Sequence, residues 1–195
     1  IKTFCLLHSK EINHELGSST NRRIIKSTNN ANFLISNSNY TKELAIKIGL
    51  DSSKIKIIFP GIEKPVNLDN LDIIKAEKVF GDSFPKIITV SRLDKRKGHD
   101  KILMLIKNLK PKFPKIKYVS VGFGKEESNL LQLRKELGLE NEVSFVKNID
   151  YNFKASLVAK SNLFLMPSRI EKKSVEGFGI SFLEAASYGV ASIGG

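Results

Sequence analysis

Residues 86–109 read KIITVSRLDKRKGHDKILMLIKNL. The first six are rich in β-branched residues and are typical of a strand, whereas the apolar residues of 99–109 recur at helical spacing. A dense basic turn joins the two. Because this order of strand, turn and helix repeats toward the carboxyl end, the sequence predicts an α/β fold with a parallel sheet covered by helices on both faces.

The same patterns place elements along the rest of the chain. Strands are expected at 1–7, 32–36, 54–59, 86–91, 116–121, 143–146, 163–166 and 190–193, the last of them buried. Helices are expected at 20–28, 39–48, 71–79, 99–109, 125–137, 153–159 and 179–188. The turn-rich segment 60–65 separates an upstream group from a downstream group. Ligands of such sheets bind at the carboxyl ends of the strands.

Composition narrows the classes of function. The chain has 195 residues, 41% of them hydrophobic, and 32 basic against 20 acidic side chains give a net charge of +12. This charge favours anionic partners, whether phosphorylated ligands, lipid head groups or nucleic acid. The lone Cys5, the lack of an apolar run of about 20 residues and the lack of a signal-peptide pattern predict a cytoplasmic protein. The chain begins without methionine and stops just after a predicted strand, so we expect a fragment cut at both ends.

The first motif that follows a predicted strand is the basic turn, Ser91–Gly98. Arg92 and Lys97 could clamp a diphosphate, Arg92 through its planar fork and Lys97 as a mobile point charge. A solvated basic loop explains the same residues equally well. Lys95 and Arg96 are expected to face solvent.

The second motif is Gly122-Phe123-Gly124, which ends one strand and precedes a helix. A G-x-G sequence alone is weak evidence for a dinucleotide site, and the third glycine of that fingerprint is absent. No acidic residue stands where the ribose of a nicotinamide cofactor would require it. We therefore expect a structural turn close to a ligand and not an oxidoreductase.

The third motif runs from Glu176 to Ala186 and combines two carboxylates, two glycines and the start of a helix expected to be mostly buried. Gly177 and Gly179 allow a ligand to approach the main chain, and a helix beginning near Gly179 would direct free N–H groups toward an anion. In a continuous helix, Glu176 and Glu184 would lie about 12 Å apart along the axis. That separation suits two ends of one elongated ligand better than two sides of one bond. Glu184 lies among apolar residues and needs a polar partner.

The histidines do not suggest a reactive site. His8 ends a predicted strand, His14 is expected in a loop and His99 at a helix start, and a structural role is favoured for each. Their spacing does not match a metal site, and we expect none.

Together the motifs strongly resemble those of retaining GT-B glycosyltransferases, in the group 1 family that includes bacterial mannosyl- and glucosyltransferases. The residues that carry this resemblance are Ser91-Arg92-Leu93, Lys97-Gly98, 121–124, 166–169 and the Glu-x7-Glu spacing of Glu176 and Glu184. It extends over the whole chain and is strongest from Lys86 onward. It implies that 1–62 is the carboxyl-terminal part of an acceptor-side Rossmann-like domain, 63–85 a linker with a first helix, and 86–195 an incomplete nucleotide-sugar-binding domain.

The resemblance also implies roles for matching positions. Arg92 and Lys97 would hold the donor diphosphate, Glu176 would lie near the donor sugar, and Glu184 would accept hydrogen bonds from the ribose. The other implied donor contacts are Phe178, Gly179, Ile180, Gly122, Asn148 and Ile149. Phe123 and Asn148 depart from the family pattern, which leaves the nucleoside end of the site open. No metal or other cofactor is implied, because cationic side chains take its place.

The implied activity is retaining transfer of a hexose from a nucleoside-diphosphate sugar to a glycan or lipid-linked acceptor, in cell-envelope polysaccharide biosynthesis. Two alternatives remain: a non-catalytic nucleotide- or polyanion-binding module, and a related epimerase or phosphorylase. Basic stretches without interleaved aromatic residues argue against nucleic acid as a partner. Arg22, Arg23 and Lys26 beside apolar residues of one helix allow a peripheral contact with the inner membrane face, although a solvated helix explains them equally well.

Overall fold

The computed structural model describes residues 1–172 and 174–195, which divide into two compact units. Unit 1 comprises Ile1–Gly61 together with Ile170–Ile180, and unit 2 comprises Ile62–Arg169 together with Ser181–Gly195. The sequence predicts a division into 1–62, 63–85 and 86–195. It does not predict that residues 170–180 belong to unit 1. A linear pattern gives the order of elements along the chain, but not the unit against which a connecting segment packs.

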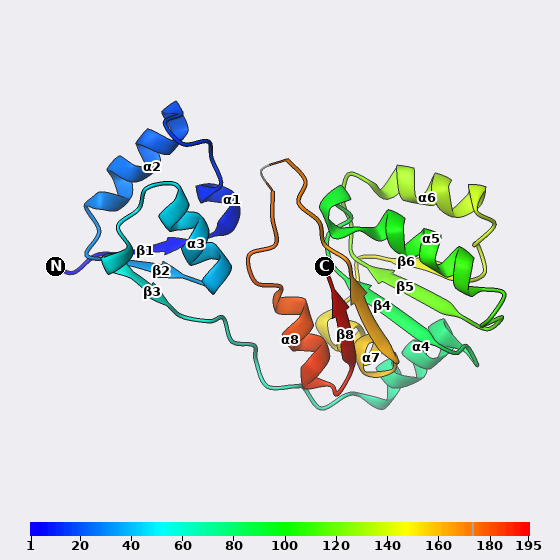
Figure 1. Ribbon diagram of the computed structural model, residues 1–195. Helices are drawn as coiled ribbons and strands as arrows, with labels where there is room; N and C mark the ends of the chain where they lie inside the picture. Colours follow the sequence, from blue (N-terminus) through cyan, green and yellow to red (C-terminus); the bar gives the residue numbers. More distant parts are fainter. Residues whose placement is uncertain (173) are drawn as a thin grey trace. The chain divides into compact units, whose positions relative to one another are not determined.

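Unit 1 is built on a three-stranded parallel sheet in the order β1-β2-β3 (Figure 1). Its elements are β1 (Phe4–Leu7), α1 (Ser9–Ile12), α2 (Ser19–Asn29), β2 (Phe33–Ser36), α3 (Asn39–Lys47), the 3-10 helix η1 (Ser52–Lys54) and β3 (Ile55–Ile57). Leu7, Leu34 and Ile55, one from each strand, are buried in a common core with Ala45 of α3. The Ser18 and Ser38 side chains cap α2 and α3 by accepting hydrogen bonds from backbone N–H groups of the first turn.

Unit 2 contains a five-stranded parallel sheet in the order β6-β5-β4-β7-β8. Its strands are β4 (Lys86–Val90), β5 (Lys117–Val121), β6 (Val143–Val146), β7 (Leu163–Met166) and β8 (Ala191–Gly194). Its helices are α4 (Asn70–Phe80), the 3-10 helix η2 (Lys95–Lys97), α5 (His99–Leu109), α6 (Glu127–Glu136), α7 (Tyr151–Ala159) and α8 (Ile180–Ser187). The sequence-based prediction of a parallel α/β fold is confirmed.

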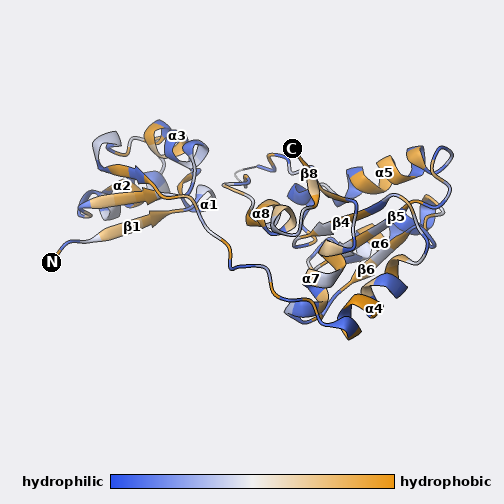
Figure 2. Ribbon diagram, turned by 90° about the horizontal axis from the view of Figure 1, so that it is seen from below, coloured by the Kyte–Doolittle hydropathy of each residue, from blue (hydrophilic) through white to orange (hydrophobic). Residues whose placement is uncertain are grey.

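Successive strand residues of unit 2 enter two separate cores, as the alternation of a pleated strand requires. Ile87 and Tyr118 pack with residues of α5, whereas Ile88 and Val119 pack with residues of α4, α7 and α8. In Figure 1, α5 and α6 lie on one face of the sheet and α4 and α7 on the other. The hydropathy colouring of Figure 2 shows α5 changing between hydrophobic and hydrophilic residues along its turns, as expected for a helix with one covered face.

The carboxyl-terminal elements are less buried than the sequence suggests. All four residues of β8 are exposed, and Ala185 is the one buried residue of α8. The prediction of a buried last strand is therefore wrong, because β8 pairs with β7 alone. The prediction that the helix buries most of its surface is confirmed for Phe182, Leu183 and Ala185, whereas Ile180 and Ala186 are exposed. The helix packs through Ala185 and Phe182, whose ring lies 5.4 Å from that of Phe164.

Candidate functional site

The strand order of unit 2 reverses at one place. β5 and β6 lie on one side of β4, and β7 and β8 lie on the other. In sheets of this kind the loops after the two central strands diverge, and ligands bind in the crevice that this leaves at the carboxyl ends. Here the two loops are the basic turn after β4 and residues 167–169 after β7.

Backbone contacts fix the basic turn from both sides. The N–H groups of Ser91 and Leu93 donate to the carbonyls of Val121 and Phe123, each at 3.0 Å, so the loop after β5 supports its first half. At its other end Gly98 has a left-handed φ of 76°, and a Cβ there would overlap the Pro167 carbonyl. A glycine is therefore required for the turn to meet the loop after β7.

The two cations predicted to clamp a diphosphate differ in their surroundings. Arg92 is exposed, with Nη2 3.4 Å from Asp94 Oδ2. Lys97 is only 8% exposed, and its Nζ lies 3.5 Å from the sulfur of Met166, the last residue of β7. Lys97 therefore places its charge at the carboxyl end of β7, beside the strand reversal.

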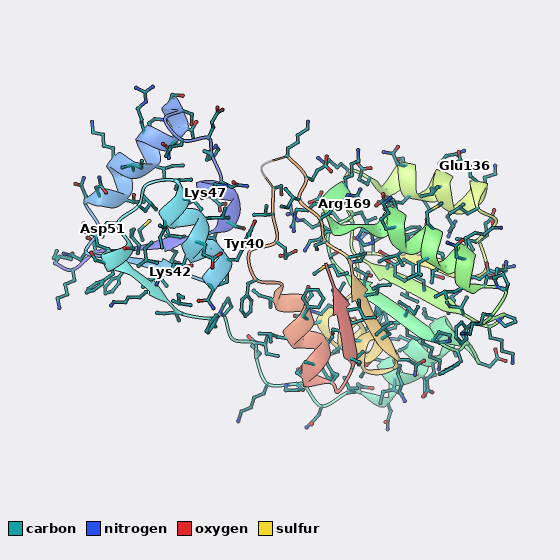
Figure 3. All side chains as sticks on the ribbon, viewed as in Figure 1. Tyr40, Lys42, Lys47, Asp51, Glu136 and Arg169 are labelled. Atoms are coloured by element: carbon teal, nitrogen blue, oxygen red, sulfur yellow. The ribbon has the colours of Figure 1, made fainter. Side chains whose placement is uncertain are left out.

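The neighbouring basic side chains behave differently from each other. Lys95 is exposed, as expected. Arg96 is only 8% exposed, so the prediction that it faces solvent is wrong. The backbone explains the difference, because the Arg96 carbonyl accepts a hydrogen bond from the N–H of Arg169 at 2.8 Å and this draws η2 against the loop after β7. Arg169, labelled in Figure 3, also donates from Nη1 to both carboxylate oxygens of Asp100 at 2.9 and 3.1 Å.

The glycines after β5 serve the basic turn. Gly122 has a φ of 143°, and a Cβ there would overlap the carbonyl oxygen of Ser91. A Cβ on Gly124 would come within 2.6 Å of Leu93. The N–H of Gly122 donates to the Val146 carbonyl at 2.9 Å and is thus already engaged. Gly122 accordingly shapes the turn beside the predicted site.

The loop after β6 carries the residues expected beside a base. Asn148 is exposed and has a φ of 55°, a conformation that asparagine tolerates better than most residues. Ile149 is partly buried against the core that contains α7 and α8. The adjacent Lys147 forms an ion pair with Glu127 at 2.5 Å.

The partner that Glu184 requires is Lys154 of α7. The Lys154 Nζ lies 3.1 Å from Glu184 Oε1, and the same ammonium lies 4.5 Å from the ring centroid of Tyr151. Both side chains of the pair are about one quarter exposed. The ion pair engages one oxygen of the carboxylate, Oε1. No pattern in the sequence identifies Lys154, because the two residues are 30 positions apart.

The first half of the Glu176–Ala186 motif lies in segment 170–180 and belongs to unit 1. There the Ser38 hydroxyl donates to the Gly177 carbonyl at 2.6 Å, and the Ser9 hydroxyl donates to the Val175 carbonyl at 3.4 Å. A Cβ on Gly177 would come within 2.8 Å of the Ser9 hydroxyl oxygen, so this glycine permits close packing. The predicted site residues as a whole are also divided between the units. Those in unit 2 are Arg92, Lys97, Gly122, Asn148, Ile149 and Glu184, and those in unit 1 are Glu176, Phe178, Gly179 and Ile180.

The other predicted site residues of segment 170–180 differ in burial. The Phe178 ring lies 6.2 Å from that of Phe59, and Glu176 is half-buried. Gly179 is buried with a φ of 84°, and Ile180 is 49% exposed at the start of α8.

A buried polar network that the sequence does not suggest lies under the basic turn. His99 is 1% exposed; its Nε2 lies 3.0 Å from Ser91 Oγ and 3.2 Å from the Arg92 carbonyl oxygen. Its Nδ1 lies 3.0 Å from the Tyr118 hydroxyl. Burial lowers the pKa of His99 from its ordinary value of 6.5 to about 4, against the opposing effect of its hydrogen bond to the Arg92 carbonyl. Burial likewise raises the pKa of Tyr118, so both groups are neutral near neutral pH.

The depressed pKa of His99 makes stability depend on pH. The unfolded chain binds the extra proton first as the pH falls, so this group leaves stability constant above about pH 6.5 and lowers it between about pH 6.5 and about pH 4. We expect the free energy of unfolding to fall by about 2 kcal/mol from this source by about pH 5. Urea unfolding of wild type and a His99→Gln variant at about pH 7.5 and about pH 5 measures it. An equal loss in both proteins would contradict the assignment to His99.

Metal-binding groups and membrane-spanning helices bear on the class of site. Across residues 1–172 and 174–195, no three His, Cys, Asp or Glu side chains are grouped so that they could hold a metal ion. In the same part of the chain, no helix has the length and apolar character needed to cross a bilayer.

The sequence profile of the family described as "Glycosyl transferases group 1" matches residues 71–195. The chain belongs to this family. Its relatives include a GDP-mannose-dependent phosphatidylinositol monomannoside mannosyltransferase of Corynebacterium glutamicum, 33% identical over 118 residues that cover 60% of this chain and 30% of the relative. The O-antigen biosynthesis glycosyltransferase WclY of Escherichia coli is 34% identical over 146 residues, covering 74% of this chain and 38% of WclY. The chain thus spans about a third of the length of these group 1 relatives.

Solved structures show the same fold. HepE of Anabaena, crystallised with UDP and glucose, superposes with a TM-score of 0.82 at 22% identity and covers 98% of this chain and 52% of HepE. A glycosyltransferase of Rickettsia africae superposes with a TM-score of 0.75 at 19% identity, covering 93% of this chain and 48% of that protein. The parallel α/β units of this group 1 chain are those of the GT-B class, as the sequence predicts.

Proposed function

We propose that the full-length protein is a metal-independent, retaining hexosyltransferase. It moves a hexose from a nucleoside-diphosphate sugar to a glycan or lipid-linked acceptor. The observation that carries this proposal is the buried Lys97 beside Arg92 at the reversal of strand order, in a chain of the group 1 family. The nucleotide diphosphate of the donor is an anion that the two cationic side chains can bind at this end of the strands.

In this proposal the two cations do the work of a metal ion. As the bond between the anomeric carbon and the diphosphate oxygen breaks, negative charge builds up on the leaving nucleotide. The Lys97 ammonium and the Arg92 guanidinium stabilise this charge, and they do so more strongly in the transition state than in the bound donor. The acceptor hydroxyl oxygen bonds to the anomeric carbon on the face that the diphosphate leaves, its proton passes to the departing phosphate oxygen, and no cofactor other than the substrate takes part.

The other residues grip the remaining parts of the donor. Glu184 accepts hydrogen bonds from the ribose hydroxyls through the oxygen that Lys154 does not engage. Asn148 and Ile149 flank the base. Backbone N–H groups of Phe178, Gly179 and Ile180 meet the phosphate and the sugar, and Glu176 binds the hydroxyls of the transferred hexose.

Relatives and structural neighbours support a nucleoside-diphosphate sugar as donor without deciding its base. One relative is named for GDP-mannose, and HepE was solved with UDP-glucose. Thermal unfolding of the full-length protein with UDP-, GDP- and ADP-sugars separates these, since a ligand at about 100 times its Kd stabilises by about 2.7 kcal/mol. We expect one base to stand out. Salt-sensitive RNA binding with no response to any sugar nucleotide would instead indicate a polyanion-binding module, and release of free or isomerised sugar without an acceptor would indicate a phosphorylase or epimerase.

Removing the Glu184 carboxylate should weaken donor binding more than it slows chemistry. Loss of charge-assisted hydrogen bonds to the ribose, about 1.5–3 kcal/mol, should raise the KM for the donor by about 10- to 100-fold in Glu184→Ala, with kcat changed only a few-fold. Steady-state kinetics of the full-length protein measure both constants. Glu136→Ala, which removes an exposed carboxylate of α6, is the matched control. An unchanged KM in Glu184→Ala would exclude the ribose contact.

We also propose that the protein works at the cytoplasmic face of a membrane. Several relatives are named for phosphatidylinositol-linked acceptors, and the net charge of +12 favours anionic lipid surfaces. On α2, Arg22, Arg23 and Lys26 are exposed, whereas Ile24 and Ile25 pack against the core of unit 1. A contact through α2 would therefore be electrostatic and would not insert apolar side chains. Sedimentation with vesicles containing anionic lipid at low and high salt tests this contact.

A further inference from the structure

We propose that His99 is a positioning residue for the diphosphate site, which it serves by holding the carbonyl of Arg92 in a fixed place. This inference rests on the proposed function. His99 is the first residue of α5, and its imidazole lies under the start of the basic turn that carries both proposed clamp residues. It links that turn to the strands on both sides of the strand reversal.

The proton positions follow from the acceptors. The Arg92 carbonyl can only accept, so the bond of 3.2 Å to it requires a proton on His99 Nε2. In the neutral ring Nδ1 then carries no proton and must accept. The Ser120 hydroxyl, at 3.3 Å, can donate to it, whereas Tyr118, at 3.0 Å, gives its single proton to Thr89. We assign this tautomer to the imidazole, in which Nε2, also 3.0 Å from Ser91 Oγ, donates toward the turn.

The network continues into the sheet. The Tyr118 hydroxyl donates to Thr89 Oγ1 at 3.0 Å, and the Thr89 hydroxyl donates in turn to the Leu165 carbonyl of β7. When Tyr118 uses its single proton on Thr89, the Ser120 hydroxyl supplies the proton that Nδ1 accepts. This chain of hydrogen bonds connects His99 to β5 directly and to β4 and β7 through Tyr118 and Thr89. The contact between Nε2 and the Arg92 carbonyl is the one that holds the turn.

The charged groups around the imidazole set its protonation state. Lys97 disfavours the charged ring, whereas Asp94 and Asp100 favour it, and burial outweighs the two carboxylates. A neutral ring is also the form that the carbonyl and the hydroxyls can satisfy together. His99 thus supports the turn without placing a third cation under it.

The test compares His99→Gln, which keeps a polar group near the Nε2 position, with His99→Asn, which keeps one near the Nδ1 position. The amide nitrogen of Gln reaches about as far as Nε2 and can still donate to the Arg92 carbonyl, whereas the shorter Asn side chain reaches only the Nδ1 position. In the full-length protein we expect His99→Asn to lower kcat by about 100-fold, as for a catalytic group displaced by about 1 Å, and His99→Gln to restore most of this loss. Ile106→Val, which trims a buried side chain of the same helix outside this network, should lower Tm and leave kcat within a few-fold of wild type.

The outcomes separate a positioning role from a purely structural one. If kcat falls equally in His99→Asn and His99→Gln, or falls as far in Ile106→Val, the positioning role is overturned. Long-range 1H–15N spectra of the wild-type protein give a readout that does not depend on activity: we expect the tautomer protonated at Nε2, and protonation at Nδ1 would also overturn the inference. A wild-type protein that turns over no sugar nucleotide would reject the proposed function and this role with it, whereas an active wild type with unaffected variants would reject only the role of His99.

Discussion

Replacing Lys97 with alanine should lower kcat of the full-length protein by about 100- to 1000-fold, the usual effect of removing one group that stabilises charge in a transition state. Lys97 is only 8% exposed and lies at the strand reversal, so neither water nor a neighbouring surface lysine can replace its charge. Because alanine would also leave a cavity, Lys97→Met is the better variant, since it keeps most of the volume and removes the charge. Steady-state kinetics at saturating donor measure the loss.

Lys95→Ala provides the matched control for Lys97. It removes the same charge from the same 3-10 helix at an exposed position, and we expect kcat close to that of wild type. Comparable losses in both variants would mean that only the overall charge of the turn matters, and would contradict a specific role for Lys97. Near-normal turnover in Lys97→Met would contradict the diphosphate clamp altogether.

Among single glycine-to-alanine substitutions in unit 2, we expect Gly122→Ala to be the most damaging. Its Cβ would overlap the Ser91 carbonyl oxygen, and its φ of 143° is unfavourable for any side chain. Relief requires the loop after β5 or the basic turn to move, so we expect a loss of about 3 kcal/mol or more in stability together with loss of turnover. Thermal unfolding and kinetics of the full-length protein measure the two effects.

Gly138→Ala separates backbone strain from the steric overlap. Gly138 also has a left-handed φ, 63°, but a Cβ there would meet nothing within 4 Å. We expect a cost of about 1–2 kcal/mol from the backbone alone and no effect on turnover. Equal losses in the two variants would show that the packing of Gly122 on Ser91 is unimportant.

Local patterns predicted the strands and longer helices of this fold, but not the short helices α1, η1 and η2. The helix at 99–109 has bounds identical to those of α5, because apolar spacing and the preceding glycine define both its face and its start. Local patterns do not encode the order of strands in a sheet. The sequence therefore predicts a strand at 190–193 but not that β8 is an exposed edge, and it predicts the basic turn but not that Arg96 is drawn against the loop after β7.

The candidate site shows the same limit. Residue types and their places in the sequence single out Arg92, Lys97 and Glu184 as candidates, and their roles stay predictions. Their partners could not be predicted, because Met166 lies 69 positions from Lys97 and Lys154 lies 30 positions from Glu184. No sequence motif marks His99 as a candidate site residue. Its importance depends on three hydroxyls brought together by the pairing of β4 with β5, which only the folded chain shows.

Calorimetric titration of the full-length protein with UDP, GDP and the corresponding nucleosides tests the proposed nucleotide site most directly. We expect one nucleoside diphosphate to bind, Lys97→Met to weaken it by about 10- to 100-fold without affecting the nucleoside, and Glu184→Ala to weaken both. These differences would assign the diphosphate to Lys97 and the ribose to Glu184. A wild-type protein that binds neither diphosphate, or a Lys97→Met variant that binds it with unchanged affinity, would contradict the site.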